Sequence, residues 1–303
     1  MAESTIFIWC WPATAATVLG KCLSNVDEVE YWHDPYWNCY NIEQLGDLKM
    51  ETLSPELQKY FTKIREAAVP TDGKKFFEGS ESLPSETFKY PIIKEKLEEG
   101  LTGRKFRIIK DVSRSMINHE EFLAEVPARH VFLIRHPYRV FYSMTRTVRE
   151  MCQRIGFGEV DFDMFRGLPS FHEYVDKDHC HTLWKHLQET QNVTPLIIET
   201  EDLVNHPDKI LPELFRYSGI PFQEKYLKWS ESRDVLKKWK TSERSMVANW
   251  GLKTFERAFT SSSFVPHSNP LPKKEDLPSV YSEHIHILVK SYEEMHNQRF
   301  QPS

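Results

Sequence analysis

The sequence contains no run of 18 continuous apolar residues, so no membrane-spanning helix is predicted. It also has no excess of positive charge: 39 Lys and Arg residues against 44 Asp and Glu residues give a formal net charge of -5. Because nucleic-acid binders need a basic footprint, this balance argues against that class of partner. A local cationic pocket for one multiply charged ligand is still compatible with it.

The five cysteines are an odd number, are widely scattered, and include no CxxC pair. A zinc site or a disulfide framework is therefore not expected. The first residues, MAESTIFIWCWP, lack the basic stretch and seven-residue apolar run of a secretory signal. These absences favour a reduced, soluble, cytoplasmic protein without a metal, either a monomer or a homodimer, with no membrane or nucleic-acid partner.

What the sequence does contain is an alternation of strand-like and helix-like segments, with 40% hydrophobic and 13% aromatic residues for a core. A β-prone run at 5–11 is broken by Pro12 and followed by a helical pattern at 13–23. Strands are further predicted at 106–110, 130–134 and 195–199, and helices at 51–68, 138–152, 174–191, 210–218 and 280–296. The order predicts an α/β fold with a parallel sheet.

No internal repeat or linker divides this alternation, so we expect a single domain over residues 1–303. Two segments are expected to be irregular. Residues 69–91 are rich in turn formers and predict a surface excursion, and residues 239–279 mix aromatic, basic and serine-rich stretches. Gly219 is expected to end the helix at 210–218.

Small residues fill the junction between the first strand and the first helix, as Pro12, Ala13, Thr14, Ala15, Ala16 and Thr17. Such a junction lets backbone N–H groups approach an anion, which the helix dipole also favours. The Thr14 and Thr17 hydroxyls could add donors. An ordinary helix start with alanines for helix propensity is an equal alternative. The Walker A pattern GxxxxGK[ST] is absent, which disfavours a P-loop kinase.

A second constellation follows the strand at 130–134. Arg135 stands at its carboxyl end, where open α/β sheets bind ligands, and Ser143 lies eight residues later on the next helix. The two side chains are predicted to hold one phosphate, the guanidinium by a bidentate contact and the serine by its hydroxyl. The alternative is that Arg135 simply pairs with a nearby carboxylate.

These segments resemble the sulfotransferases that use 3'-phosphoadenosine 5'-phosphosulfate (PAPS). Arg135-His136-Pro137 followed by Ser143 has the spacing of the family's 3'-phosphate motif, and Pro12 to Thr17 takes the place of its phosphosulfate loop. Residues 197–203 and 217–222 are similar to the strand, Glu-Asp-Leu and Gly-[Leu/Ile]-Pro-Phe patterns. The resemblance covers residues 5–222 and is vaguer beyond Trp239, where 250–253 and 261–264 could border the nucleotide.

The resemblance implies a P-loop NTPase-like three-layer sandwich, with a central parallel sheet and helices on both faces. It also implies transfer of a sulfuryl group from PAPS to a hydroxyl or amine of a small soluble acceptor, without metal, leaving 3'-phosphoadenosine 5'-phosphate (PAP). Thr200 and Lys253 are carried over as further nucleotide contacts. The sequence departs from the family at Ala13, which usually is Arg or Lys, and at Ala16. A PAPS- or PAP-binding protein with lost or reduced catalysis is therefore the second hypothesis.

Transfer should need a cation beside the leaving oxygen and a base for the acceptor's proton. Lys110 at the end of its strand resembles the family's assisting lysine, but Asp111-Val112 follows where the family has a catalytic histidine. Asp34, His33 and then Asp111 are the candidate bases, in that order. The alternatives are a turn fixed by Asp34-Pro35 and a solvated strand-end charge at Lys110.

Aromatic residues near these positions suggest an apolar-walled acceptor pocket, formed by Trp9, Trp11, Tyr36 and Trp37. Core packing explains any one of them equally well. The run Asp178-His179-Cys180-His181 looks like a set of metal ligands, but adjacent helix positions face different ways, so no metal is expected there.

Overall fold

The computed structural model describes residues 4–67, 70–168, 171 and 175–302. Six strands form one sheet in the order β5-β4-β1-β3-β2-β6, and neighbouring strands run parallel. They are β1 (Ser4–Cys10), β2 (Val29–His33), β3 (Phe106–Val112), β4 (Ala128–Ile134), β5 (Leu196–Glu199) and β6 (Trp239–Lys240). The predicted parallel α/β sheet is confirmed, and all four predicted strands belong to it.

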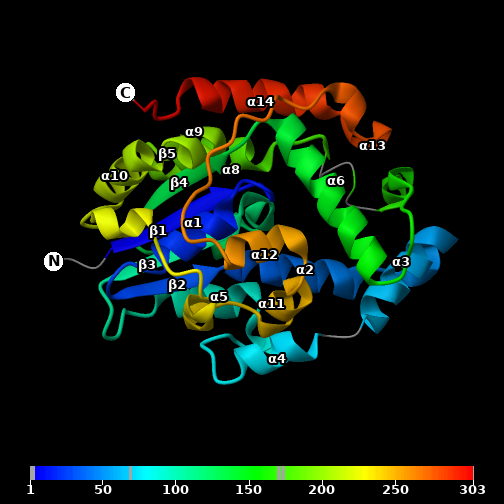
Figure 1. The fold of residues 1–303 in the computed structure, drawn as a ribbon, viewed down its shortest axis with the longest axis horizontal. Helices are drawn as coiled ribbons and strands as arrows, with labels where there is room; N and C mark the ends of the chain where they lie inside the picture. Colours follow the sequence, from blue (N-terminus) through cyan, green and yellow to red (C-terminus); the bar gives the residue numbers. More distant parts are fainter. Residues whose placement is uncertain (1–3, 68–69, 169–170, 172–174, 303) are drawn as a thin grey trace.

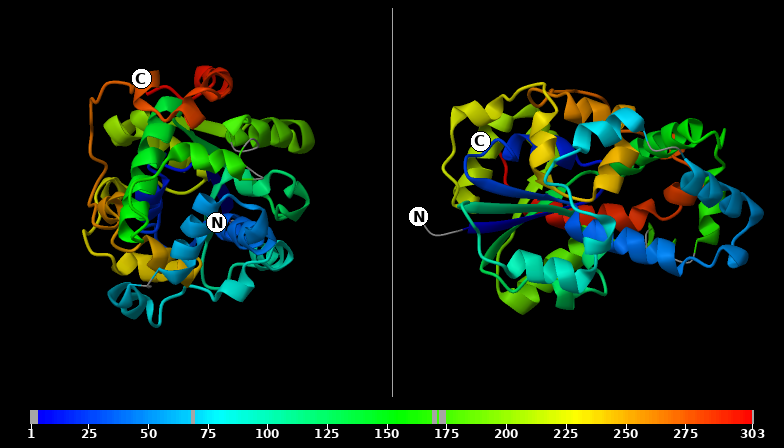
Figure 2. Two further views of the ribbon diagram at one scale, coloured as in Figure 1. Left: turned by 90° about the vertical axis from the view of Figure 1, so that its right-hand side faces the viewer. Right: turned by 90° about the horizontal axis from the view of Figure 1, so that it is seen from below.

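Helices surround the sheet (Figures 1 and 2). Within the described residues they are α1 (Ala16–Leu23), α2 (Pro35–Asp47), α3 (Pro55–Glu66), α4 (Thr71–Phe77), α5 (Tyr90–Glu98), α6 (Pro137–Arg154), α8 (His179–Gln191), α9 (Thr200–Asn205), α10 (Pro207–Ser218), α11 (Glu243–Asn249), α12 (Lys253–Phe259), α13 (Ser279–Ser282) and α14 (Ile285–Asn297). Short 3₁₀ turns connect several of them.

The central strand β1 divides the core in two. Its side chains alternate between the sheet faces, so Ile6 and Ile8 pack with α1, α10, α11 and α12. Phe7 and Trp9 pack on the opposite face with α2, α5, α8 and α14. Because both faces of β1 are buried, its sequence is a continuous apolar run rather than an alternating one. The expected three-layer arrangement is therefore observed.

Local sequence signals place the helix ends near the candidate site. The His136 side chain accepts a hydrogen bond from the backbone N–H of Tyr138, and Pro137 occupies the first turn, so α6 begins directly after β4. Gly219 ends α10 with φ 70°, as predicted. The first helix begins at Ala16 rather than Ala13, which leaves residues 11–15 as a loop.

Several sequence predictions need correction. The segment 69–91, of which residue 69 lies outside the described part, is not simply a surface excursion, because α4 buries Phe77 against Trp250. The segment 239–279 is not irregular throughout, since it contains β6, α11 and α12. Strands β2 and β6 were not predicted. The helix expected at 174–191 begins at His179, and residues 172–174 are not described.

Among the described residues, no helix combines the length and the apolar character needed to cross a membrane.

Candidate active site

The loop between β1 and α1 is held in an unusual backbone conformation. Ala13 and Ala15 have φ of 64° and 56°, in the left-handed region that costs residues other than glycine about 1–2 kcal/mol. Within the described ranges, no protein acceptor receives a hydrogen bond from the backbone N–H groups of residues 13–18. Because the first N–H groups of a helix have no intrahelical partner, they are available to an anion.

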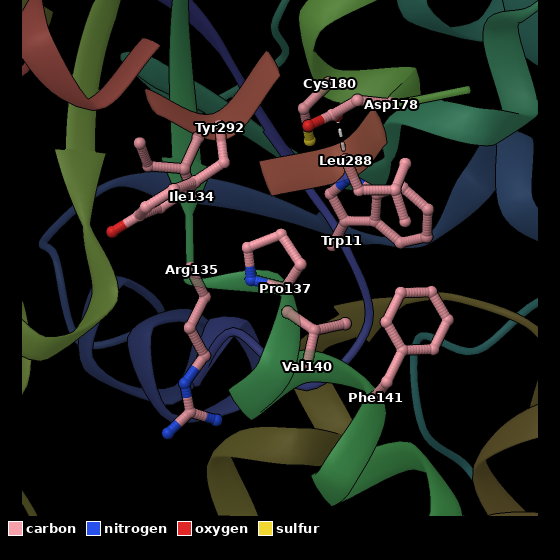
Figure 3. A pocket seen from close by; sticks show the side chains of 10 residues that line it. All are labelled: Trp11, Ile134, Arg135, Pro137, Val140, Phe141, Asp178, Cys180, Leu288 and Tyr292. Carbon is pink, nitrogen blue, oxygen red and sulfur yellow. Dashed lines mark hydrogen bonds between the residues drawn. The ribbon is translucent and has the colours of Figure 1, made fainter. Parts of the chain in front are cut away.

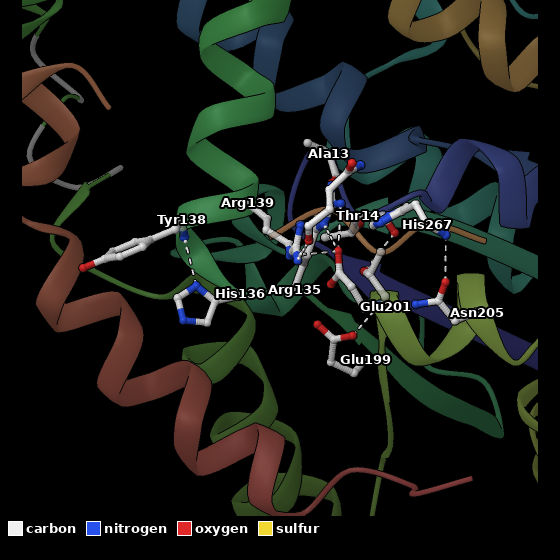
Figure 4. A network of polar contacts seen from close by, with 12 residues as sticks. Ala13, Thr14, Arg135, His136, Tyr138, Arg139, Glu199, Glu201, Asn205 and His267 are labelled. Carbon is white, nitrogen blue, oxygen red and sulfur yellow. Dashed lines mark hydrogen bonds and ion pairs between the residues drawn. The ribbon is translucent and has the colours of Figure 1, made fainter. Parts of the chain in front are cut away.

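Three side chains hold this loop in place, and Figure 4 shows one of them, Arg135, beside Ala13. The Thr14 hydroxyl donates to the Trp11 carbonyl at 2.8 Å. The Thr200 hydroxyl lies 3.1 Å from the Thr14 carbonyl oxygen and 2.8 Å from that of Ile134. Arg135 Nη1 donates to the Ala13 carbonyl at 2.7 Å. Thr14 and Thr200 were expected to bind the cofactor; both are buried and anchor the loop, and their contact with a cofactor stays a prediction.

Thr17 is a further candidate for a hydroxyl contact with the cofactor. It stands in the first turn of α1, is half-buried, and its hydroxyl has no hydrogen-bond partner among the described residues. Pro12 and Ala16 contribute backbone to the same junction.

Arg135 lies beside the loop and is paired with Glu201. Its Nε donates to Glu201 Oε1 at 2.9 Å, and its Nη2 lies 2.8 Å from the same oxygen. Arg139 Nε also approaches this oxygen, at 3.4 Å. The carboxylate pairing considered as an alternative is thus present. A guanidinium has five N–H donors, so these contacts and the Ala13 bond leave two donors for a ligand.

Ser143 lines a separate hollow of about 300 Å³ between α6 and α12. The hollow is lined by Ser143, Arg146, Arg149, Glu150, Gln153, Lys253, Thr254 and Arg257. Four cationic side chains face one carboxylate, so the hollow favours anions. Ser143 and Lys253, which were predicted separately as nucleotide contacts 110 positions apart, meet here.

The three arginines of the hollow were missed by sequence reasoning. Arg146 and Arg149 are three apart on α6, and Lys253 and Arg257 are four apart on α12. This spacing could have predicted two basic faces. Only the tertiary structure brings them together.

Helix α12 connects the hollow to the loop region. Thr147 of α6 and Thr254 of α12 have hydroxyls 3.2 Å apart, and Glu150 Oε1 accepts the Lys253 backbone N–H at 2.5 Å. On its other side α12 packs against α1, where Lys21 Nζ donates to the Phe259 carbonyl at 2.6 Å. Among the described residues no contact joins Arg135 to Ser143, so their grip on a single phosphate stays a prediction.

The candidate reaction centre lies on the other side of β1, across β3 and β2. His33 is beside Lys110 in the β2–β3 pairing. Lys110 Nζ is 2.7 Å from Asp34 Oδ1, and His33 Nε2 is 3.2 Å from Asp34 Oδ2. Both Lys110 and Asp34 act electrostatically on the Cys10 thiol, which also contacts the Thr14 side chain of the loop. The predicted lysine and both leading base candidates therefore form one cluster beside the loop.

Burial decides the charges of this cluster. Burial lowers the pKa of His33 to about 4, although Asp34 opposes the shift, so the imidazole is neutral near pH 7. Burial also disfavours the Lys110 charge, but Asp34 more than offsets it, and the lysine pKa is raised. The Asp34 side chain keeps 17% of its surface exposed, against 6% for His33 and 7% for Lys110. Asp34 is the member that an acceptor can reach most directly.

Asp111, the third candidate base, is a structural residue. Its carboxylate is fully buried and accepts hydrogen bonds from the backbone N–H groups of Tyr36, Trp37 and Val112 and from the Ser115 hydroxyl. It therefore caps the start of α2 from the neighbouring strand. With three backbone donors and the Ser115 hydroxyl around it and no surface exposed, Asp111 is less accessible to an acceptor than Asp34, and its role as a base stays a prediction.

The expected aromatic acceptor wall is mostly core. Trp9 and Tyr36 are fully buried, and Trp9 Nε1 donates to His130 Nδ1 at 3.1 Å. Trp11 lines a cavity of only about 10 Å³ and donates to Asp178, as Figure 3 shows. Trp37 is half-buried and stacks on Tyr40, and is the one member placed to meet a ligand.

The Asp178–His181 run starts α8, where Asp178 Oδ1 accepts the backbone N–H of His181 at 3.1 Å. In the part of the chain that the structure describes, no group of three or more His, Cys, Asp or Glu side chains is arranged to hold a metal ion.

No protein-family model matches this chain, and no curated protein matches it. Its structure is similar to three solved sulfotransferases. A sulfotransferase domain from the curacin biosynthetic pathway has 16% identity and a TM-score of 0.45 over 98% of this chain and 97% of its own. The sulfotransferase domain of the Synechococcus PCC 7002 olefin synthase has 17% identity and a TM-score of 0.45 over 98% and 96%. Mouse sulfotransferase SULT7A1 complexed with PAP has 12% identity and a TM-score of 0.38 over 100% and 86%.

Proposed function

We propose that this chain binds PAPS and transfers its sulfuryl group to a hydroxyl or amine of a small acceptor. The observation that carries the proposal is the cationic hollow in which Ser143 and Lys253 meet. The resemblance had assigned both residues to the nucleotide without any reference to each other. Arg146, Arg149 and Arg257 add the positive charge that a 3'-phosphate requires.

The loop at 11–17 supplies the second anion site. The N–H groups of residues 13–18 suit the 5'-phosphosulfate, which is anionic at every pH of interest. Arg135 lies beside this loop, and its two remaining donors are assigned, with Ser143, to the 3'-phosphate. The hollow and the loop lie on elements that both contact α12. A ligand with anionic groups at both ends therefore fits better than one with a single phosphate chain.

The reaction centre lies beside the loop and provides the two helpers for transfer. The acceptor oxygen or nitrogen forms a bond to sulfur while the bond between sulfur and the 5'-phosphate oxygen breaks. Asp34 takes the acceptor's proton, and Lys110 stabilises the negative charge that develops on the leaving phosphate. No metal is required for this balance.

A binding protein without turnover is the second candidate, and two observations favour it. Ala13 offers the loop no cationic side chain. Both oxygens of Asp34 are already engaged, by Lys110 and His33. An acceptor must displace one of these partners before Asp34 can act as a base.

Calorimetry with PAP and with ATP tests the nucleotide assignment. We expect PAP to bind more tightly, because only PAP carries the 3'-phosphate that the hollow would hold. A preference for ATP would remove the sulfotransferase proposal in favour of a kinase. Turnover of labelled PAPS with a panel of phenols, alcohols and amines separates an enzyme from a binding protein.

The variant Ala13→Arg makes the turnover experiment with labelled PAPS more specific. Position 13 already holds a non-glycine residue at φ 64°, so the longer side chain adds little backbone strain. We expect turnover to rise several-fold if the loop only lacks a cation. Ala13→Gln, which has similar length but no charge, is the matched control. An equal effect of both variants would show that charge is not what the loop lacks.

A further inference from the structure

A chain of polar contacts runs from α14 to the loop between β1 and α1. The Tyr292 hydroxyl lies 3.4 Å from Glu199 Oε1. Glu199 Oε2 accepts the backbone N–H groups of Glu201 and Asp202, which places the two glutamates on the same turn. Glu201 in turn holds Arg135, and Arg135 holds the Ala13 carbonyl (Figure 4).

One atom in this chain lacks an ordinary donor. Glu201 Oε2 is buried, and no N–H or hydroxyl group among the described residues donates to it. The neighbouring titratable group is the Glu199 carboxyl, which is 4% exposed and is held to the same turn by the Glu201 N–H. Two buried carboxyls this close in one site repel each other when both are ionised, so one of them should carry a proton, and that proton can reach the oxygen that has no other donor.

We propose that Glu199 and Glu201 share one proton and thereby act as positioning residues for Arg135, so that nucleotide binding requires the protonated pair. The protonated Glu199 carboxyl donates to Glu201 Oε2, and Glu201 keeps its negative charge and its contact with Arg135. This inference rests on the proposed function, because it assigns Arg135 to the nucleotide.

The surroundings place the proton on Glu199. Burial, followed by the neighbouring Glu201, raises the pKa of Glu199 to about 8. Burial acts on Glu201 in the same direction, but the Glu199 hydrogen bond, Arg135 and Arg139 outweigh it, and the Glu201 pKa is lowered. The charged and titratable groups around the pair are Asp202 on α9, Arg135 and His136 between β4 and α6, Arg139 on α6, Tyr292, Glu293 and His296 on α14, and Arg299 just after α14.

The functional consequence follows from losing that proton. Above about pH 8 both carboxyls are ionised and repel each other, and an additional negative charge stands beside the arginine that meets the phosphate. PAP affinity should then fall by up to about tenfold per pH unit, the limit for one linked proton. The phosphates of PAP do not titrate in this range, since their second pKa is about 6.

Glu199→Gln isolates this effect. The amide mimics a protonated carboxyl: its oxygen accepts the α9 N–H groups, and its NH2 group donates to Glu201 Oε2. Calorimetry with PAP between pH 7 and pH 9.5 should show the loss of affinity in the wild type, whereas Glu199→Gln should stay within about twofold of its neutral value. Glu213→Gln, which alters an exposed pair with Arg216, is the matched control and should follow the wild type.

Lys21 is a second group that titrates here, because burial lowers its pKa to about 8. It is unchanged in Glu199→Gln, so equal alkaline losses in the wild type and in this variant would overturn the proposal. Infrared difference spectroscopy gives a readout without nucleotide: a protonated-carboxyl stretch at neutral pH should be absent in Glu199→Gln. If that band is present but PAP binds at no pH, the proposed function is wrong and the proposal of a shared proton is kept. If the band is absent in the wild type, the proposal of a shared proton is wrong.

Discussion

The proposed nucleotide side of the site and the candidate reaction centre differ in how much of their hydrogen-bonding capacity is already used. Around the loop, the N–H groups of residues 13–18 have no protein acceptor, and the hollow has four cations to one carboxylate. Around Lys110, each charge already has a partner and little surface is exposed. The first region is prepared for an anion, whereas the second must exchange a contact before it can react. Binding and turnover should therefore respond to different substitutions.

The largest difference between the effect on turnover and the effect on PAP binding is expected for Asp34→Asn. The variant keeps the side-chain shape but cannot accept a proton, so kcat should fall by about 100- to 10,000-fold. The affinity for PAP should stay within about twofold, because Asp34 contacts neither the loop N–H groups nor the hollow. Steady-state turnover combined with calorimetry measures both. If the affinity fell together with kcat, the two regions would not be separable.

Arg135→Ala should have the opposite pattern. Loss of the guanidinium removes charge-assisted contacts and the bond to the Ala13 carbonyl, so PAP affinity should fall by about 100-fold. Calorimetry measures the loss, and thermal unfolding checks that the variant is folded. Arg129→Ala is the control, since Arg129 binds the Tyr217 carbonyl near the opposite end of β4. Unchanged affinity in Arg135→Ala would show the phosphate assignment to be wrong.

Single substitutions in the hollow should have smaller effects. Arg149→Ala and Lys253→Ala each remove one of four exposed or partly exposed cations, so PAP affinity should fall by about tenfold or less. Adenosine 5'-phosphate, which lacks the 3'-phosphate, should bind both variants as it binds the wild type. Lys225→Ala, in an exposed pair with Asp27, controls for net charge. An equal loss for both nucleotides would place the 3'-phosphate elsewhere.

The last prediction concerns stability in acid and does not involve the nucleotide. Burial lowers the pKa of both His33 and His130 to about 4, whereas an unfolded histidine titrates near 6.5. The unfolded chain therefore binds protons between pH 6.5 and 4 while the folded chain does not. The free energy of unfolding should keep its full value above pH 6.5. Below pH 6.5 it should decrease, by at most about 1.4 kcal/mol per pH unit for each histidine.

Urea unfolding at pH 7, 6 and 5 measures this slope. His130→Gln keeps an acceptor for Trp9 Nε1 and should make the slope shallower, whereas the same change at the exposed His286 should not. A slope that His130→Gln leaves unchanged would mean that other groups control acid stability.

The sequence predicted the parts of the fold that depend on local pattern. The four predicted runs became β1, β3 and β4 in the interior of the sheet and β5 at its edge, and strands buried on both faces are expected to be rich in apolar residues. The two-residue strand β6 and the mixed-polarity β2 offered no such pattern. The 69–91 segment looked like a loop by composition, yet Phe77 and Gly73 meet Trp250, a contact between residues far apart in the chain.

The sequence by itself determined the place of the residues that we propose to bind anions: the 11–17 junction, Arg135 and Lys110 all stand at the carboxyl ends of buried strands. Tertiary structure decided what each polar group does there, because a hydroxyl or carboxylate acts through whichever donors and acceptors surround it. It made Thr14 and Thr200 anchors, Asp111 a helix cap and Trp9 a core residue. It also joined the arginines of α6 with Lys253, since proximity between distant helices is not encoded in either one alone.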